Sequence, residues 1–240
     1  MEIDIQLVPS PLDLDILSDR TVVVIDVLRA TTVMVNAMFQ GALEIIPVAT
    51  VEEAFQMRKV LLQRSVILGG ERGSKKIPGF DLGNSPKEYV AERVKRKKLI
   101  LTTTNGTKAF HLVSTAKKIL VGSFLNIGVT AQKCLELNRD LLIFPSGDEG
   151  NFSLEDNLCG GMLIEQIMKK SGKRIALTDA SHCVQILYER YKANIVEAFR
   201  LSHHGKELIK RGFGEDLVYC AQMDITNIVP EFKDGVIRTD

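Results

Sequence analysis

An excess of charge of either sign is missing from this sequence. Its 240 residues include 31 lysines and arginines and 30 aspartates and glutamates, so the formal net charge is +1. Proteins that bind nucleic acids or membrane surfaces through their overall charge usually have a strong basic excess. The single basic run, KRKK at residues 95–98, is typical of a solvated helix end. We therefore expect no nucleic acid and no membrane among the partners.

Signals of export and of disulfide bonding are also missing. The first residues, MEIDIQLVPS, have neither the basic start nor the apolar core of a signal peptide. No apolar run is long enough to cross a bilayer. The cysteines are far apart and form no C-x-x-C pair, which is typical of thiols in a reducing compartment. We expect a cytoplasmic protein with four buried thiols, Cys134, Cys159, Cys183 and Cys220.

Linkers rich in proline, glycine or serine, internal repeats and low-complexity segments are absent as well. The apolar content of 45% and the charged content of 25% are ordinary for a globular protein. We expect a single domain over residues 1–240, or, as an alternative, a domain in which residues 178–240 form a helical C-terminal subdomain. The sequence leaves open whether the protein is a homodimer.

Short apolar runs alternate with helical patterns through most of the chain. This alternation predicts an α/β fold, a three-layer α/β/α sandwich with a mainly parallel, doubly wound sheet and a helical C-terminal extension. Ser85, Pro86 and Glu88 have the spacing of a capping box at the start of one helix. The expected strands are residues 3–8, 21–25, 43–48, 66–68, 99–102, 119–121 and 141–144, with a closing pair at 227–229 and 236–237. The expected helices are residues 31–40, 51–63, 86–94, 106–114, 127–137, 154–170, 180–193, 195–201, 206–211 and 216–223.

Asp26 comes directly after the expected strand at residues 21–25, whose β-branched apolar run suits a strand buried on both faces. A carboxylate at the C-terminal end of a buried strand, just before a helix, lies where open α/β sheets bind ligands. Burying it costs several kcal/mol unless a cation or hydrogen bonds satisfy it. Arg29 and Thr31 follow within five residues. The alternative roles of Asp26 are a helix N-cap and an ion pair with Arg29.

Three further loops after predicted strands are unusually polar. Residues 69–86 are longer than most loops without function, and they carry Glu71, Arg72, Lys75 and Lys76. Residues 102–107 offer hydroxyls and free N–H groups at a helix start, a pattern that indicates either an anion site or an ordinary Asn-Gly turn with a threonine cap. Residues 146–156 end in two adjacent acids, Glu155 and Asp156, which either bind a ligand or offset the helix dipole behind the cap Ser153.

Carboxylates without clustered histidine or cysteine favour Mg²⁺ over Zn²⁺. Arginine and N–H groups beside such a site suit a phosphate or a sulfonate. The residues therefore indicate phosphoryl chemistry, although the C-x5-R, D-x-D and P-loop signatures are absent from the expected places. The pair His203-His204 lacks the preceding arginine of histidine acid phosphatases, and His111 and His182 lie in helical patterns.

Five sequence blocks occur in order: VIDVLRATT, LGGERGSKKIPGFDLGNSP, TTTNGTKAF, GSFLN and GDEGNFSLEDNLCGG. Together they closely resemble the 2-phosphosulfolactate phosphatase family, from about Val22 to Gly161 and more weakly to the C-terminus. The resemblance implies Mg²⁺-dependent hydrolysis of 2-phosphosulfolactate to sulfolactate and inorganic phosphate. In methanogens this step belongs to coenzyme M biosynthesis, and bacterial relatives serve other sulfolactate pathways.

Our hypothesis for the mechanism assigns Mg²⁺ to Asp26, Glu71 and Asp156, with Glu155 as a weaker candidate ligand. These three acids and Arg29 are the expected catalytic residues. Attack by water and an aspartyl-phosphate on Asp26 both remain open. Arg72, Lys75 or Lys76 would bind the sulfonate or the carboxylate. The expected substrate-binding residues are Arg29, Thr31, Arg72, Thr104, Asn105, Gly106, Thr107, Ser123 and Asn126.

Two other functions compete with this hypothesis. The first is a Mg²⁺-dependent phosphatase of a different small anionic phosphoester. The second is a non-catalytic anion-binding module, which would use the arginines and threonines but has no obvious need of three carboxylates. A dinucleotide oxidoreductase is a distant third, because GGERG is a poor match to G-x-G-x-x-G.

Overall fold

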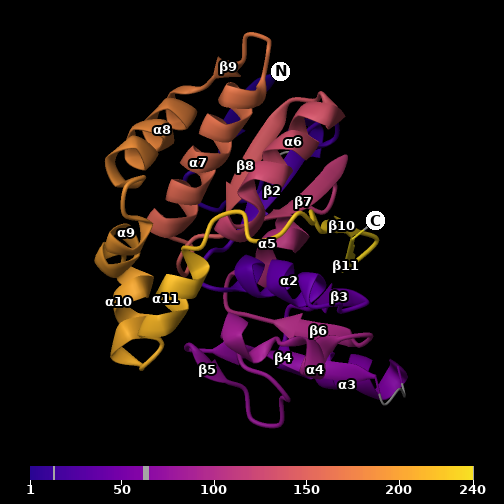
Figure 1. Ribbon diagram of the computed structural model, residues 1–240. Helices are drawn as coiled ribbons and strands as arrows, with labels where there is room; N and C mark the ends of the chain where they lie inside the picture. The colour runs from indigo at the N-terminus through magenta and orange to yellow at the C-terminus, as the bar shows by residue number, and fades with distance from the viewer. Residues whose placement is uncertain (13, 62–64, 240) are drawn as a thin grey trace.

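The structure is a computed structural model that describes residues 1–12, 14–61 and 65–239. Within these residues the strands form one mixed, mostly parallel sheet with helices on both faces (Figure 1), which confirms the expected α/β/α class. The order along the sheet is β5 (Lys75–Lys76), β4 (Val66–Arg72), β6 (Lys98–Thr102), β3 (Glu44–Pro47), β11 (Val236–Arg238), β10 (Glu231–Lys233), β7 (Lys118–Gly122), β2 (Thr21–Ile25), β8 (Leu141–Pro145), β1 (Glu2–Ile5) and β9 (Ala176–Leu177).

A C-terminal hairpin divides this sheet into two parallel groups. The strands β4, β6 and β3 pair in parallel, and so do β7, β2, β8, β1 and β9. Between the groups, β3 pairs with β11, β11 with β10 and β10 with β7, each time antiparallel. Three reversals mean that the two groups run in opposite directions along the sheet. The sheet is mainly parallel, as predicted, but the sequence did not indicate that the closing strand pair lies at its centre.

The hairpin begins later than the sequence predicts. The closing pair exists, but its first strand is β10 at Glu231–Lys233, and not residues 227–229. Pro230 has no N–H to donate to a ladder, so regular pairing starts after it. Its carbonyl still accepts a hydrogen bond from the N–H of Val121 on β7 (2.9 Å).

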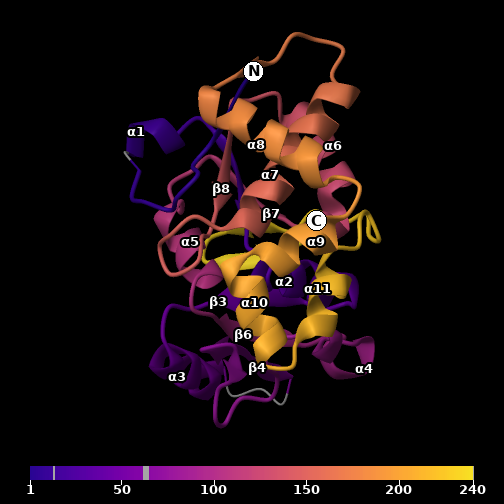
Figure 2. The same cartoon turned by 90° about the vertical axis from the view of Figure 1, so that its left-hand side faces the viewer.

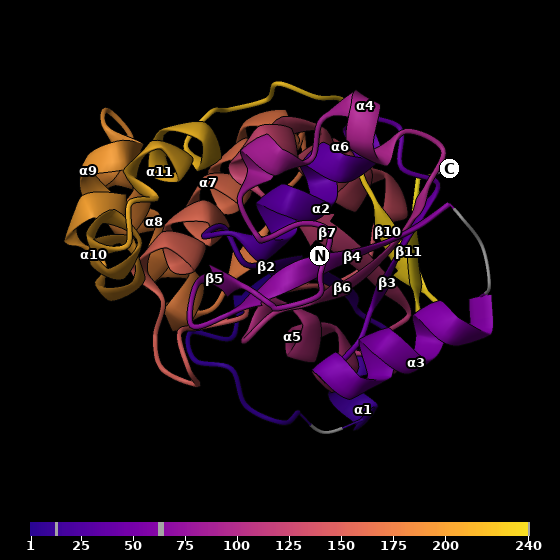
Figure 3. The same cartoon turned by 90° about the horizontal axis from the view of Figure 1, so that it is seen from below.

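Helices cover both faces of the sheet, and Figure 3 shows α2 and α4 on one side of β4 and β6, with α3 and α5 on the other. The helices are α1 (Leu14–Leu17), α2 (Ala30–Phe39), α3 (Val51–Leu61), α4 (Ala91–Val94), α5 (Gly106–Leu112), α6 (Ile127–Leu137), α7 (Leu154–Lys170), α8 (Asp179–Tyr191), α9 (Ile195–Leu201), α10 (His203–Lys210) and α11 (Gly214–Cys220), with 3₁₀ turns η1 (Pro86–Glu88) and η2 (Phe124–Asn126). Residues 62 and 63, the expected end of α3, lie outside the described residues. None of these helices is long and apolar enough to span a membrane.

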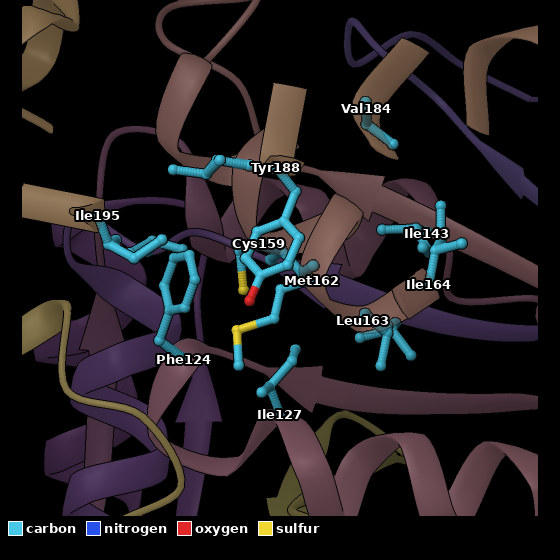
Figure 4. Packing of buried hydrophobic residues seen from close by; sticks show 14 of the residues in the cluster. Phe124, Ile127, Ile143, Cys159, Met162, Leu163, Ile164, Val184, Tyr188 and Ile195 are labelled. Carbon is cyan, nitrogen blue, oxygen red and sulfur yellow. The ribbon is translucent and has the colours of Figure 1, made fainter. Parts of the chain in front are cut away.

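The strand β2 is buried on both faces, which explains its unbroken apolar run. Val23 and Ile25 join a cluster with α6, α7, α8 and α9, and Val22 and Val24 join a second cluster with α2 and α5. Figure 4 shows part of the first cluster, where Met162 and Cys159 of α7 lie near the ring of Tyr188. A smaller third cluster lies between α3 and the strands β4 and β6.

Two local predictions were wrong for tertiary reasons. The expected helix at 86–94 is split into η1 and α4, and no capping box forms. The Ser85 hydroxyl donates instead to Asp216 (2.7 Å), and Glu88 accepts from the N–H of Gly83 (3.0 Å). The prediction of four buried thiols was also wrong, because Cys183 is exposed on α8 while the other three cysteines are buried.

Candidate active site

A cavity of about 200 Å³ lies where segments that follow β2, β4, β6 and β8 meet the helix α10. Figure 2 shows α10 and α11 in front of β3, β6 and β4. Five of the predicted site residues line the cavity, namely Asp26, Arg29, Glu71, Thr104 and Asn105. The remaining lining residues are Leu28, Gly73, Ser74, Asn84, Thr103, Asp148, Glu149, His203, His204, Glu207 and Arg211.

Asp26 is 6% exposed and stands at the junction of β2 and α2. One oxygen of its carboxylate accepts a hydrogen bond from the N–H of Ala30 (3.1 Å). Its own N–H donates to the hydroxyl of Thr31 (2.9 Å), and that hydroxyl donates to the Asp26 carbonyl (2.9 Å). Burial raises the pKa of Asp26, and hydrogen bonds from the Ala30 N–H and the Ser146 hydroxyl oppose the rise. Thr31 thus shapes the turn behind the carboxylate, and it does not line the cavity.

Gly106 lies directly against Asp26. A Cβ atom at this position would be 2.6 Å from Oδ2 of Asp26 and 2.5 Å from Cβ of Ala30. Glycine is therefore required for the start of α5 to approach the end of β2 so closely. Gly106 is buried and does not belong to the cavity lining itself.

Glu71 connects the loops that follow β4 and β6. One of its oxygens accepts from the N–H and the hydroxyl of Thr104 (2.8 and 2.9 Å). The other accepts from the N–H of Ser74 (2.8 Å). The side chain of Asn105 accepts from the N–H of Glu149 (3.2 Å), which adds the loop after β8. The Glu71 carboxylate thus joins two loops of one group of strands, and Asn105 links them to a loop of the other group.

Arg29 is paired with Asp216 of α11, and not with Asp26. Its Nη1 is 2.7 Å from Asp216, its Nη2 donates to the carbonyl of Ser74 (3.2 Å), and its guanidinium lies over the ring of Phe213. The side chain is 1% exposed. Its Nε has no hydrogen-bond partner among the described residues. Asp216 is separated from Arg29 by 187 positions, and no sequence pattern indicated it.

Asp156 lies behind Asp26 and outside the cavity lining. Its carboxylate accepts from the N–H of Val27 (2.8 Å) and from the hydroxyl of Ser146 (3.4 Å). Burial and the charges of Asp26 and Glu155 raise its pKa well above the ordinary value. Ser153 caps α7, as the alternative interpretation of this loop proposed. Ser146 thus contacts both Asp26 and Asp156.

The helix α10 and the residue that follows it bring four lining residues that the sequence did not indicate, His203, His204, Glu207 and Arg211. Nδ1 of His203 is 2.7 Å from the carboxylate of Asp148, which follows β8. That carboxylate raises the pKa of His203. The adjacent histidines were visible in the sequence, but only the position of α10 in the fold brings them to the cavity.

The other predicted binding residues lie outside the lining. The guanidinium of Arg72 donates to the carbonyls of Glu71 and Ala49 and to the hydroxyl of Thr102. Lys75 and Lys76 are exposed on β5. The remaining three side chains are buried and bonded within the protein: Thr107 to Thr103, and Ser123 and Asn126 to each other in the cap of η2.

The acids do not form a closed metal cage. In the part of the chain that the structure describes, no three histidine, cysteine, aspartate or glutamate side chains are grouped so that they could hold one metal ion. Asp26 and Glu71 line the same cavity and are close enough for the charge of Glu71 to raise the pKa of Asp26. A divalent ion here would need water or substrate oxygens to complete its coordination.

The fold is that of an α/β protein whose polar cavity lies at the ends of its parallel strands, where such folds bind ligands. A family model described as 2-phosphosulpholactate phosphatase matches residues 7–235, and the chain belongs to this family. Membership places it among the phosphoric monoester hydrolases, as the five sequence blocks predicted.

Relatives cover almost the whole chain. A protein named "Probable 2-phosphosulfolactate phosphatase" from Caldanaerobacter subterraneus subsp. tengcongensis is 42% identical over 223 residues, which are 93% of this chain and 92% of that protein. A protein of the same name from Clostridium acetobutylicum is 40% identical over 237 residues, 99% of this chain and 100% of that protein. The likeness therefore extends past Gly161 into the C-terminal helices, which include α10.

Proposed function

We propose that this protein hydrolyses 2-phosphosulfolactate to sulfolactate and inorganic phosphate. The observation that carries the proposal is the Asp26 carboxylate, which is buried at the end of β2 and yet lines a polar cavity. Family membership supports the reaction, because the relatives bear the name of this activity. The Arg29 guanidinium, buried and paired with Asp216, instead holds the loop after β4 through the carbonyl of Ser74.

The charge of the cavity supports a requirement for a cation. Among the described residues, five carboxylates and two guanidiniums line it, and the guanidinium of Arg29 is already neutralised by Asp216. Such a lining repels a phosphate dianion unless a cation lies between them. Mg²⁺ suits hard oxygen donors and keeps several water ligands. The five acids are Asp26, Glu71, Asp148, Glu149 and Glu207.

Asp26 and Glu71 are the residues that we propose to hold Mg²⁺, with water and phosphate oxygens as the remaining ligands. Bound there, the ion would neutralise negative charge on the phosphate oxygens. Asp156, the third expected ligand, lies outside the lining, and we propose that it positions Asp26 from behind by holding the N–H of the adjacent Val27. Glu71 has capacity left, since a carboxylate offers about four acceptor sites and three hydrogen bonds to it are present.

The proposed chemistry uses Asp26 and His203. Ala30 N–H and the Ser146 hydroxyl hold the Asp26 carboxylate, so it can take a proton from an attacking water or attack the phosphorus itself. The second route passes through an aspartyl-phosphate that water then hydrolyses. His203, oriented by Asp148, would give a proton to the departing alkoxide oxygen. Trapping a labelled acyl-phosphate on Asp26 would exclude the direct route.

The decisive experiment measures phosphate release from 2-phosphosulfolactate with Mg²⁺ and then with EDTA. We expect release with Mg²⁺, loss with EDTA and recovery when Mg²⁺ is restored. Asp26→Asn should lower kcat by at least about 10³-fold, because the amide is neither a base nor a nucleophile. The matched control is Asp19→Asn, in an exposed turn before β2, which should leave kcat unchanged.

Near-normal turnover by Asp26→Asn, with an unchanged melting temperature, would remove Asp26 from the chemistry. A panel of phosphorylated hydroxy acids tests the rival substrate class, since a better substrate than 2-phosphosulfolactate would reassign the enzyme.

We further propose that the reaction takes place in the cytoplasm, on the ground that the four cysteines are free, and that it serves sulfolactate metabolism such as coenzyme M biosynthesis.

A further inference from the structure

We propose, resting on the proposed function, that Arg211 binds the sulfonate of the substrate and so determines its specificity. The substrate carries a sulfonate and a carboxylate in addition to the phosphate. Asp26 and Glu71 serve the phosphate in the proposed function. The sulfonate distinguishes this molecule from other phosphorylated hydroxy acids, and it needs a cation of its own in an acid-rich cavity.

The other arginines and lysines that the sequence suggested are already occupied or lie elsewhere. The Arg72 guanidinium donates to the carbonyls of Glu71 and Ala49 and to the Thr102 hydroxyl, and Arg72 does not line the cavity. Both terminal nitrogens of Arg29 are bonded to protein, and its side chain is 1% exposed. Lys75 and Lys76 are exposed on β5 and do not line the cavity. Arg211, whose side chain is 35% exposed, remains.

Arg211 follows the last turn of α10 and reaches the turn between β4 and β5. Its Nη1 donates to the carbonyl of Gly73 (2.7 Å), and its Nη2 is 3.4 Å from the carboxylate of Glu207 one turn earlier. A guanidinium has five N–H donors, so three remain available. Because both ends of the group are held, little side-chain entropy is lost when a ligand binds.

The chemistry of the group fits the ligand. A planar guanidinium can give two parallel N–H donors to two oxygens of one anion, whereas lysine acts as a point charge. The proposed role of Arg211 also explains why an anion-binding cavity contains Glu207, because this carboxylate positions the Arg211 guanidinium. The resulting cavity binds phosphate through residues after β2 and β4, and sulfonate through the end of α10.

The test is Arg211→Gln, assayed with both reaction products as inhibitors. We expect KM for 2-phosphosulfolactate and the Ki of sulfolactate to rise roughly 10- to 100-fold, the loss of a charged hydrogen-bonded pair. The kcat value and the Ki of inorganic phosphate should change less than about threefold, because phosphate does not touch Arg211. Arg211→Lys keeps the charge without the planar fork and should give an intermediate rise in KM.

Lys210→Gln is the matched control, since it removes one positive charge from the neighbouring exposed residue, and it should leave all four constants unchanged. Equal rises in the Ki of phosphate and of sulfolactate, or a fall in kcat alone, would show that Arg211 only joins α10 to the turn between β4 and β5. If Arg211→Gln does not fold, the same four constants measured for Arg211→Lys test the proposal. If the wild type releases no phosphate, the proposed function fails, and titration calorimetry with sulfolactate still tests Arg211.

Discussion

At the scale of single residues, the candidate active site depends on how closely the backbone approaches Asp26 as much as on charge. Asp26 is held on one side by the N–H of Ala30 and bordered on the other by Gly106, which leaves no room for a side chain. The Ser146 hydroxyl completes the surroundings of the carboxylate. A carboxylate confined in this way has one orientation, which is what a base or a nucleophile requires.

Gly106→Ala should therefore damage both stability and catalysis. The new methyl group meets Ala30 and Asp26 at distances below van der Waals contact, and such overpacking typically costs about 1–3 kcal/mol. A displaced Asp26 should lower kcat/KM at least about tenfold. Urea unfolding and initial rates measure the two effects. Gly172→Ala, where a Cβ meets nothing within 4 Å, is the control, and equal behaviour of both variants would contradict the prediction.

At the scale of elements, Glu44 joins three strands at the centre of the sheet. It lies on β3 and contacts Lys98 of β6 (2.8 Å) and Arg238 of β11 (2.6 Å). Burial raises the pKa of Glu44, but the hydrogen bonds from Lys98 and Arg238 outweigh it and leave the pKa below the ordinary value of 4.5. A group whose pKa is lowered by folding stabilises the folded state wherever it is ionised.

Glu44→Gln should therefore destabilise the protein at pH 7 by about 1–2 kcal/mol. The contribution of Glu44 is complete above its unfolded pKa of 4.5 and is lost as the pH falls through the lower folded pKa. Urea unfolding at pH 7 and near pH 3 should show the difference between variant and wild type shrinking toward zero. Glu52→Gln, an exposed change on α3, serves as control. A loss of stability in Glu44→Gln that is the same at both pH values would contradict the role assigned to the ionised Glu44 side chain.

For some elements, local sequence patterns were sufficient to predict where the element begins and ends. The strand β2 and the helices α6, α7 and α9 begin and end where the sequence predicts, because their apolar patterns and start signals are local. The predicted helix at 86–94 was wrong because the Ser85 hydroxyl donates to Asp216, which is 131 positions away. No local pattern encodes such a partner.

At the scale of the whole molecule, the last strands join the two groups of the sheet. Ile237 of β11 pairs with Ile45 of β3, and Phe232 of β10 pairs with Ile119 of β7. Both Ile237 and Phe232 are buried in the second apolar cluster. The hairpin thus connects the group that carries Asp26 with the group that carries Glu71, and both residues line one cavity.

Truncation after Pro230 should therefore abolish cooperative folding and activity, because it removes core residues and leaves β3 and β7 with unpaired edges. Circular dichroism on heating, with activity in parallel, measures the loss. Truncation after Arg238 keeps both strands and is the control. A protein shortened at Pro230 that melts and turns over like the wild type would show that the hairpin is not required.

The sequence by itself determined the class of fold, the limits of its most regular elements and the presence of Asp26, Arg29, Glu71, Thr104 and Asn105 in the site. Apolar periodicity, cap residues and strand-end carboxylates are short-range features, so they can be recognised without coordinates. Only the tertiary structure decided that Arg29 pairs with Asp216, that Asp156 lies behind the cavity and that α10 supplies Arg211. These contacts join residues far apart in the chain, so their free energy depends on tertiary packing that no short-range pattern encodes.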